Sequence, residues 1–120
     1  MSAAGLTPID SAAQIDALVD ESRMRPVVIF KFSRTCGTSA YAADELHAYL
    51  QGEPADARYA VVTVQTHRAL SDAIAARLGV RHESPQFIVV RDGEVVWHVS
   101  HFRATAAELT AALSRPAAAQ

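Results

Sequence analysis

The chain has 120 residues, half of them hydrophobic, and a formal net charge of −2. This length and composition predict one soluble domain that spans residues 1–120 and buries its own core. The 11 basic and 13 acidic residues are interspersed, which argues against a nucleic-acid partner, and no apolar run approaches the about 20 residues of a membrane span.

The first residues carry no positively charged side chain and contain no apolar run, so the sequence does not indicate a secretory signal peptide. The single cysteine, Cys36, cannot form an internal disulfide, and an oxidising compartment would therefore add nothing to the stability of the fold. We expect a cytoplasmic protein with disordered tails at residues 1–8 and 116–120.

The first two thirds of the chain alternate between helical and strand patterns. Ser11 and Gln14 form a capping box that begins a helix ending near Ser22. Two strand patterns, at residues 27–32 and 59–64, are almost continuously apolar, which is typical of parallel strands buried on both faces. Apolar residues at helical spacing predict two further helices, at residues 40–50 and 70–78.

The last third predicts a hairpin and a closing helix. Asp92-Gly93 is a strong turn signal for a hairpin, and Thr105 with Glu108 forms a second capping box before the final helix. The flanking strand patterns occupy residues 86–90 and 95–99. The resulting order, α-β-α-β-α-β-β-α, predicts an α/β domain in which a four-stranded mixed sheet lies between helices.

Cys36 stands where the first core strand passes into a helix. Backbone N–H groups at a helix start lack intrahelical partners, and their positive potential lowers a cysteine pKa from about 8.5 into the range of roughly 3.5–7.5. The neighbouring Thr35 and Thr38 are polar, which favours a reactive thiol over a buried structural one. The Ser39 hydroxyl could donate to the thiolate, or it could simply cap the helix.

The second candidate segment precedes the hairpin. A proline that opens a strand opposite a cysteine at a helix start resembles the arrangement of the thioredoxin fold, so we expect a cis peptide bond between Ser84 and Pro85. His82 and Glu83 come directly before it and should lie close to Cys36. They are candidates for tuning the thiolate or binding a ligand, with a solvated loop pair as the alternative.

A metal site is not indicated. His98 and His101 are three residues apart near a strand end, where side chains do not converge as they do on a helix. The sequence offers no second ligand cluster to complete a zinc site.

Three strings resemble the monothiol bacilliredoxins of the YtxJ type, over roughly residues 26–113. They are Lys31-x-Ser33-x-x-Cys36-x-x-Ser39, Arg81-His82-Glu83-Ser84-Pro85-Gln86 and Trp97-His98-x-Ser100-His101. The resemblance implies a thioredoxin-like fold and a thiol–disulfide oxidoreductase. Cys36, assisted by Ser39, would remove a low-molecular-weight thiol from mixed disulfides on S-thiolated client proteins. Candidate contacts to the thiol or the client are Thr35, Gly37, Thr38, His82, Glu83, Ser84 and Pro85.

The resemblance implies bacillithiol as the co-substrate, with no bound cofactor. The chain has no second cysteine, so another small thiol must resolve the adduct on Cys36.

Two residues depart from the family pattern: Phe32 replaces a histidine, and Gly37 replaces the proline that usually follows the cysteine. The string Cys36-Gly37-Thr38-Ser39 also resembles the Cys-Gly-Phe-Ser of monothiol glutaredoxins. The alternatives are therefore another small thiol, a glutaredoxin-like carrier of an iron–sulfur cluster, or a non-catalytic module whose cysteine senses oxidants.

Overall fold

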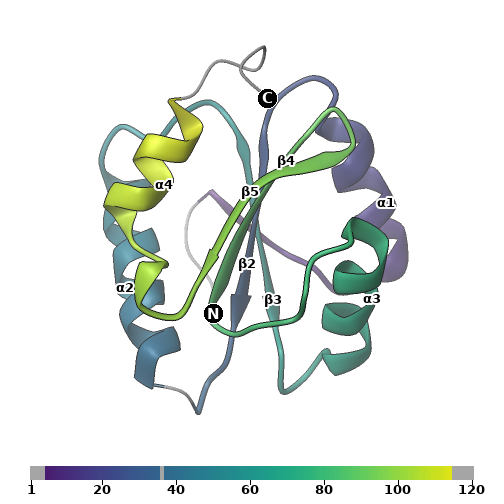
Figure 1. Cartoon of the computed structure of the whole chain (residues 1–120), viewed down its shortest axis with the longest axis horizontal. Helices are drawn as coiled ribbons and strands as arrows, with labels where there is room; N and C mark the ends of the chain where they lie inside the picture. Colours follow the sequence, from purple (N-terminus) through teal and green to yellow (C-terminus); the bar gives the residue numbers. More distant parts are fainter. Residues whose placement is uncertain (1–4, 36, 115–120) are drawn as a thin grey trace.

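The computed structural model describes residues 5–35 and 37–114. Cys36 lies outside them. In this part of the chain, a five-stranded mixed sheet carries helices on both faces (Figure 1). The elements in chain order are β1 (Leu6–Pro8), α1 (Ala12–Glu21), β2 (Val27–Phe32), α2 (Gly37–Gln51), β3 (Arg58–Thr63), α3 (Arg68–Leu78), β4 (Gln86–Arg91), β5 (Glu94–Ser100), the short 3-10 helix η1 (His101–Arg103) and α4 (Ala106–Leu113). No helix among these residues is both long and apolar enough to cross a bilayer.

The strands are arranged in the order β1-β3-β2-β4-β5. β1, β3 and β2 run parallel, whereas β4 is antiparallel to β2 and β5 is antiparallel to β4. β2 is the central strand and is covered by helices on both sides, so Val27 to Lys31 are all buried. This double burial explains why the strand is continuously apolar rather than alternating.

The prediction of four strands, with residues 1–8 as a disordered tail, is wrong for residues 6–8. Leu6–Pro8 pair in parallel with residues 59–61 of β3, and the Ile9 N–H donates to the Val61 carbonyl at 2.8 Å. Leu6 and Ile9 are both buried, and this apolar burial holds the edge strand in place. Gly5 lies in the turn before β1, and residues 1–4 and 116–120 of the predicted tails lie outside the described part of the chain.

The core is divided into two layers by the sheet. Helices α1 and α3 cover one face, and α2 and α4 cover the other (Figure 1). Val28 and Phe30 belong to the cluster on the α2–α4 side, and Val27 and Ile29 to the cluster on the α1–α3 side. Because side chains alternate along a strand, Lys31 points to the same face as Ile29, toward α3.

Local signals positioned most element ends correctly. Ser11 and Gln14 form the predicted capping box, and Gly79 ends α3 in the left-handed conformation at φ 68°. The hairpin turn places Asp92 and Gly93 at φ 52° and 80°, the positive values that a type I′ turn requires. α2 differs from its prediction because it begins at Gly37 rather than at residue 40.

The second capping box is formed only in part. The Thr105 hydroxyl accepts from the Glu108 N–H at 3.2 Å, but the Glu108 carboxylate accepts from the Arg103 side chain. The Ala106 N–H at this helix start instead donates to the Glu45 carboxylate of α2 at 3.0 Å.

Candidate functional site

Two segments that are distant in sequence, the one that joins β2 to α2 and the one that precedes β4, meet at one end of the sheet. Because β2 and β4 are antiparallel neighbours, Lys31 near the end of β2 lies opposite Gln86 at the start of β4. The first turn of α2 lies at this same end (Figure 1). The loop after β2, the start of α2 and the loop before β4 therefore lie next to one another and form the candidate site.

Two predicted site residues are brought together here. Ser39 is fully buried, its Oγ accepts from the Ser33 N–H at 3.1 Å, and it lies 3.4 Å from the Ser84 Oγ. The Ser84–Pro85 peptide is cis, as the sequence led us to expect, and the Pro85 carbonyl accepts from the His101 N–H at 3.0 Å. Ser39 thus joins the loop after β2 to residues 81–85 before β4, which we call the proline loop.

Gln65 organises the segment that precedes the cysteine, and sequence reasoning missed it. Its Oε1 accepts from the Arg34 N–H at 3.0 Å, and its Nε2 donates to the hydroxyls of Ser33 at 2.6 Å and Thr35 at 3.0 Å. The available signal was positional. Gln65 follows β3, the parallel neighbour of β2, and the carboxyl ends of parallel strands meet at one edge of a sheet.

The predictions that concern the Cys36 sulfur, its thiolate and its contact with Ser39 fall outside the described residues. Gly37, on its carboxyl side, is the first residue of α2, and a Cβ added there would meet no atom within 4 Å. Thr38 is half-buried in the same turn. The described residues therefore define the two sides of the loop that holds Cys36.

His82 and Glu83 do not act as a pair. Glu83 accepts from the Ser100 Oγ at 2.6 Å and lies 3.6 Å from the His101 Nε2. The Ser100 hydrogen bond and the nearby His101 lower the pKa of Glu83, against the effect of burial. Glu83 therefore ties the proline loop to the end of β5, and the alternative of a solvated loop pair with His82 is not what the structure shows.

His82 points instead toward a buried cation. The Lys31 Nζ donates to the Ser71 carbonyl at 3.0 Å and lies 3.1 Å from the His82 Nδ1, and the Ser71 Oγ lies 3.2 Å from that same nitrogen. Burial lowers the pKa of Lys31 to about 8, with Asp72 opposing the shift. Burial, followed by the charge of Lys31, also lowers the pKa of His82.

Gln86 completes this buried polar group beside Lys31. Its Nε2 donates to the Arg81 carbonyl at 3.1 Å and so closes the loop of residues 81–86. Its Oε1 is buried and has no hydrogen-bond partner among the described residues. The sequence strings contained both Lys31 and Gln86, but gave neither of them a role.

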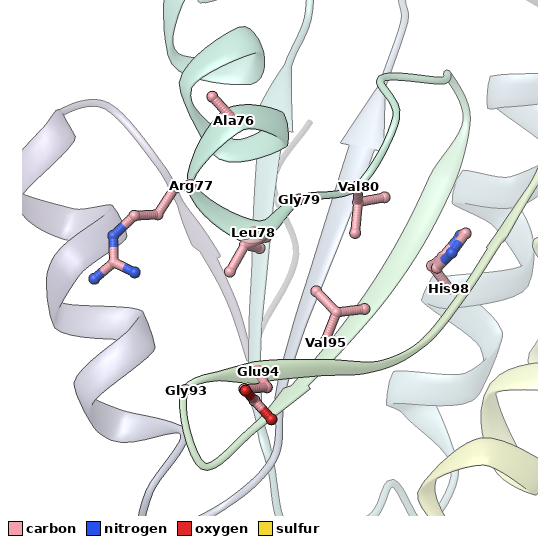
Figure 2. Close-up of a pocket in the computed structure, with 9 residues that line it drawn as sticks. All are labelled: Ala76, Arg77, Leu78, Gly79, Val80, Gly93, Glu94, Val95 and His98. Carbon is pink, nitrogen blue, oxygen red and sulfur yellow. The ribbon is translucent and has the colours of Figure 1, made fainter.

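A hollow of about 720 Å³ lies apart from these residues. Figure 2 shows that its walls come from the end of α3, the residues that follow it, and the β4–β5 hairpin with the first part of β5. His98 lines this hollow, whereas His101 pairs with Glu83. The two histidines therefore lie in different parts of the surface. None of the predicted site residues lines the hollow.

Comparison with known proteins agrees with this geometry. The family model of the monothiol bacilliredoxin BrxC matches residues 7–109. A solved structure described as a candidate oxidoreductase with a thioredoxin fold is 33% identical, with a TM-score of 0.78, and the match covers 89% of this chain and 92% of that one.

Thioredoxins share the fold at lower identity. Thioredoxin from Fasciola hepatica is 25% identical with a TM-score of 0.70, and the match covers 91% of this chain and 97% of that one. Thioredoxin f from spinach chloroplasts is 22% identical with a TM-score of 0.69, and the match covers 94% and 96% of the two chains. The family match spans most of this chain, and the chain therefore belongs to the monothiol bacilliredoxins, a family of thioredoxin-fold oxidoreductases.

Proposed function

We propose that this protein removes a low-molecular-weight thiol from mixed disulfides on client proteins, and that this thiol is bacillithiol. The observation that carries the proposal is the family match over residues 7–109. The contact between Ser39 and Ser84 supports it, because these hydroxyls join the two loops beside the only cysteine of the chain. A reducing cytoplasm would supply the small thiol.

The chemistry requires one protein sulfur. The Cys36 thiolate attacks the sulfur of the small thiol in the client mixed disulfide, a new disulfide forms on Cys36, and the client leaves as a thiolate. A second small thiol, as thiolate, then attacks the sulfur that Cys36 carries. This step releases a symmetrical small-thiol disulfide and restores the Cys36 thiolate. Electrons and protons balance without a bound cofactor.

Intact-mass analysis tests this proposal. The reduced protein is exposed separately to bacillithiol disulfide and to glutathione disulfide, and the adduct is then challenged with excess of the same reduced thiol. We expect one adduct only, which maps to Cys36, is removed by the reduced thiol, and forms faster with bacillithiol. Cys36→Ser should remain folded and form no adduct.

Each other result points to a defined alternative. Equal or faster transfer with glutathione would favour the glutaredoxin-like interpretation, and an absorbing cluster after anaerobic reconstitution would identify an iron–sulfur carrier. If no adduct forms with any thiol, the exchange proposal is wrong and a binding module remains.

A further inference from the structure

The side chain of Lys31 is a buried cation that joins the central strand to α3 and to the proline loop. Lys31 is 0% exposed. Its Nζ donates to the Ser71 carbonyl of α3 at 3.0 Å and lies 3.1 Å from the His82 Nδ1. A buried charge is costly unless hydrogen bonds compensate for the lost water. These two acceptors therefore stabilise the ammonium, and through it the proline loop is held against α3.

The protonation state of His82 follows from the same contacts. An ammonium group can only donate, so the His82 Nδ1 accepts and the ring is a neutral imidazole with its proton on Nε2. The Ser71 hydroxyl lies 3.2 Å from the same Nδ1 and can also donate to it. In an imidazolium both ring nitrogens carry a proton, and Nδ1 can then no longer accept from Lys31. Because His82 is only partly buried, it can take up that proton from solvent.

The charges around the ring oppose this second proton. The charged groups that act on His82 are Lys31 on β2, Arg68 and Asp72 on α3, and Glu83 beside it in the loop. Burial has the largest effect and lowers the pKa of His82, the two cations lower it further, and the two carboxylates oppose them. The strand partners of Lys31, Val62 on β3 and Gln86 on β4, are uncharged. An imidazolium 3.1 Å from a buried ammonium would be strongly repelled.

We propose that His82 is a pH-sensitive switch for the proline loop: the neutral ring binds Lys31 and Ser71, and the imidazolium leaves them and frees this part of the loop from α3. The other attachments of the loop do not use the ring. Glu83 still accepts from Ser100, and the Gln86 side chain still donates to the Arg81 carbonyl. The proline loop forms one side of the candidate site, so mild acid changes the shape of that side while the domain stays folded.

The direction of the pH dependence follows from thermodynamic linkage. A histidine whose pKa is lowered in the folded state contributes stability that is fully present above its unfolded value and is lost as the pH falls toward the folded value. For His82 this loss begins near the ordinary value of 6.5. The pKa of Glu83 is lowered from 4.5, so the loss of its contribution begins in stronger acid. The two effects can therefore be separated by pH.

The single lysine makes a direct test practical, because protein grown with ¹³C-labelled lysine gives one lysine Cε signal by NMR. We expect this signal to shift as His82 is protonated, with a midpoint about half a pH unit or more below that of an exposed histidine, which is roughly a threefold change in protonation equilibrium. His82→Asn keeps an acceptor near the Nδ1 position without a titrating proton and should abolish this acid step. His47→Asn, which changes an exposed histidine of α2, is the matched control and should leave it intact.

Two results would overturn the proposal: an acid step of the Lys31 signal that persists in folded His82→Asn, or a His82 midpoint at or above the ordinary value. A second variant gives an independent test. Lys31→Met replaces the cation by an apolar side chain of similar volume, and it should raise the His82 midpoint, which is measured from the ring signals absent in His82→Asn. An unchanged His82 midpoint in folded Lys31→Met would equally contradict the proposal.

Hydrogen exchange measures the release of the loop itself. Wild type and His82→Asn are compared at the same pH, so that the intrinsic exchange rates cancel. We expect amides of residues 81–83 to exchange faster in the wild type at about pH 5, and equally fast in the two proteins at about pH 7.5. Equal exchange at both pH values would show that protonation does not free the loop. None of these measurements uses a small thiol, so their outcome is independent of the exchange reaction proposed above.

Discussion

Ser39 has a structural role in addition to the one predicted for it. Its buried Oγ accepts from the Ser33 N–H and contacts the Ser84 hydroxyl. A plain helix cap would bind only an N–H of its own helix, whereas this hydroxyl joins α2 to two loops. Any donation from Ser39 to the Cys36 thiolate would use the same oxygen, so its effect on chemistry and its effect on stability are connected.

We predict that Ser39→Ala lowers the free energy of unfolding by about 1–2 kcal/mol, because the substitution leaves the Ser33 N–H without its acceptor. If the hydroxyl also donates to the thiolate, the Cys36 pKa rises. Urea unfolding measures the first effect and thiolate absorbance the second. Ser84→Ala is the control, since it removes the second hydroxyl and keeps the bond from Ser33. An equal loss of stability in both variants would contradict this account.

The Glu83–Ser100 bond makes the proline loop sensitive to acid. The Ser100 hydrogen bond, followed by the charge of His101, lowers the pKa of Glu83 from its ordinary 4.5. A carboxyl group whose folded-state pKa is lowered contributes stability that is fully present above the unfolded value and is lost as the pH falls through the folded value. The loss therefore occurs in acid, below the ordinary pKa of a glutamate.

Ser100→Ala should bring the pKa of Glu83 closer to its ordinary value. We expect the variant to be less stable than the wild type at neutral pH, and to lose less stability between neutral and strongly acidic pH. Urea unfolding across this range measures both quantities. Parallel pH profiles for the two proteins would show that the bond does not couple to folding.

At the scale of elements, one glycine stands at the start of α2 and another at the end of α3, and only the second has a backbone conformation that favours glycine. Gly37 begins α2 and has open space where a Cβ would lie, so its backbone does not require glycine. Gly79 ends α3 at φ 68°, a left-handed conformation that costs other residues free energy. The same substitution should therefore have opposite effects at these two helix ends.

We predict that Gly37→Ala raises the free energy of unfolding by about 0.4–1 kcal/mol, because alanine has less conformational freedom in the unfolded chain. Gly79→Ala should lower it by about 1–2 kcal/mol. Chemical denaturation of both variants measures the difference. If Gly37→Ala is destabilising, the backbone at the start of α2 needs a conformation that only glycine adopts easily.

For the whole molecule, the arrangement of strands decides which residues meet at the site. β2 lies between parallel β3 and antiparallel β4, so the residues after β2 and β3 and those before β4 share one edge of the sheet. Gln65, which follows β3, donates to Thr35, the residue before Cys36. Ser84, from the loop before β4, contacts Ser39 in the first turn of α2. The end of β5 adds Ser100 through Glu83.

The sequence by itself determined the type and order of most elements, because helix caps, turns and apolar periodicity depend on residues close together in the chain. The box at Ser11 and the turn at Asp92-Gly93 were both readable in this way. The position of the single cysteine between a strand and a helix singled out Cys36, whose thiol chemistry stays a prediction.

Only the tertiary structure decided which distant side chains share a hydrogen bond. The edge strand β1 is too short to show an alternation of apolar and polar residues. Its pairing with β3 depends on the burial of Leu6 and Ile9. His82 and Glu83 are adjacent in sequence, yet His82 turns toward Lys31 while Glu83 turns toward Ser100. Such contacts form between elements that are brought together by packing, and no local pattern in the chain encodes them.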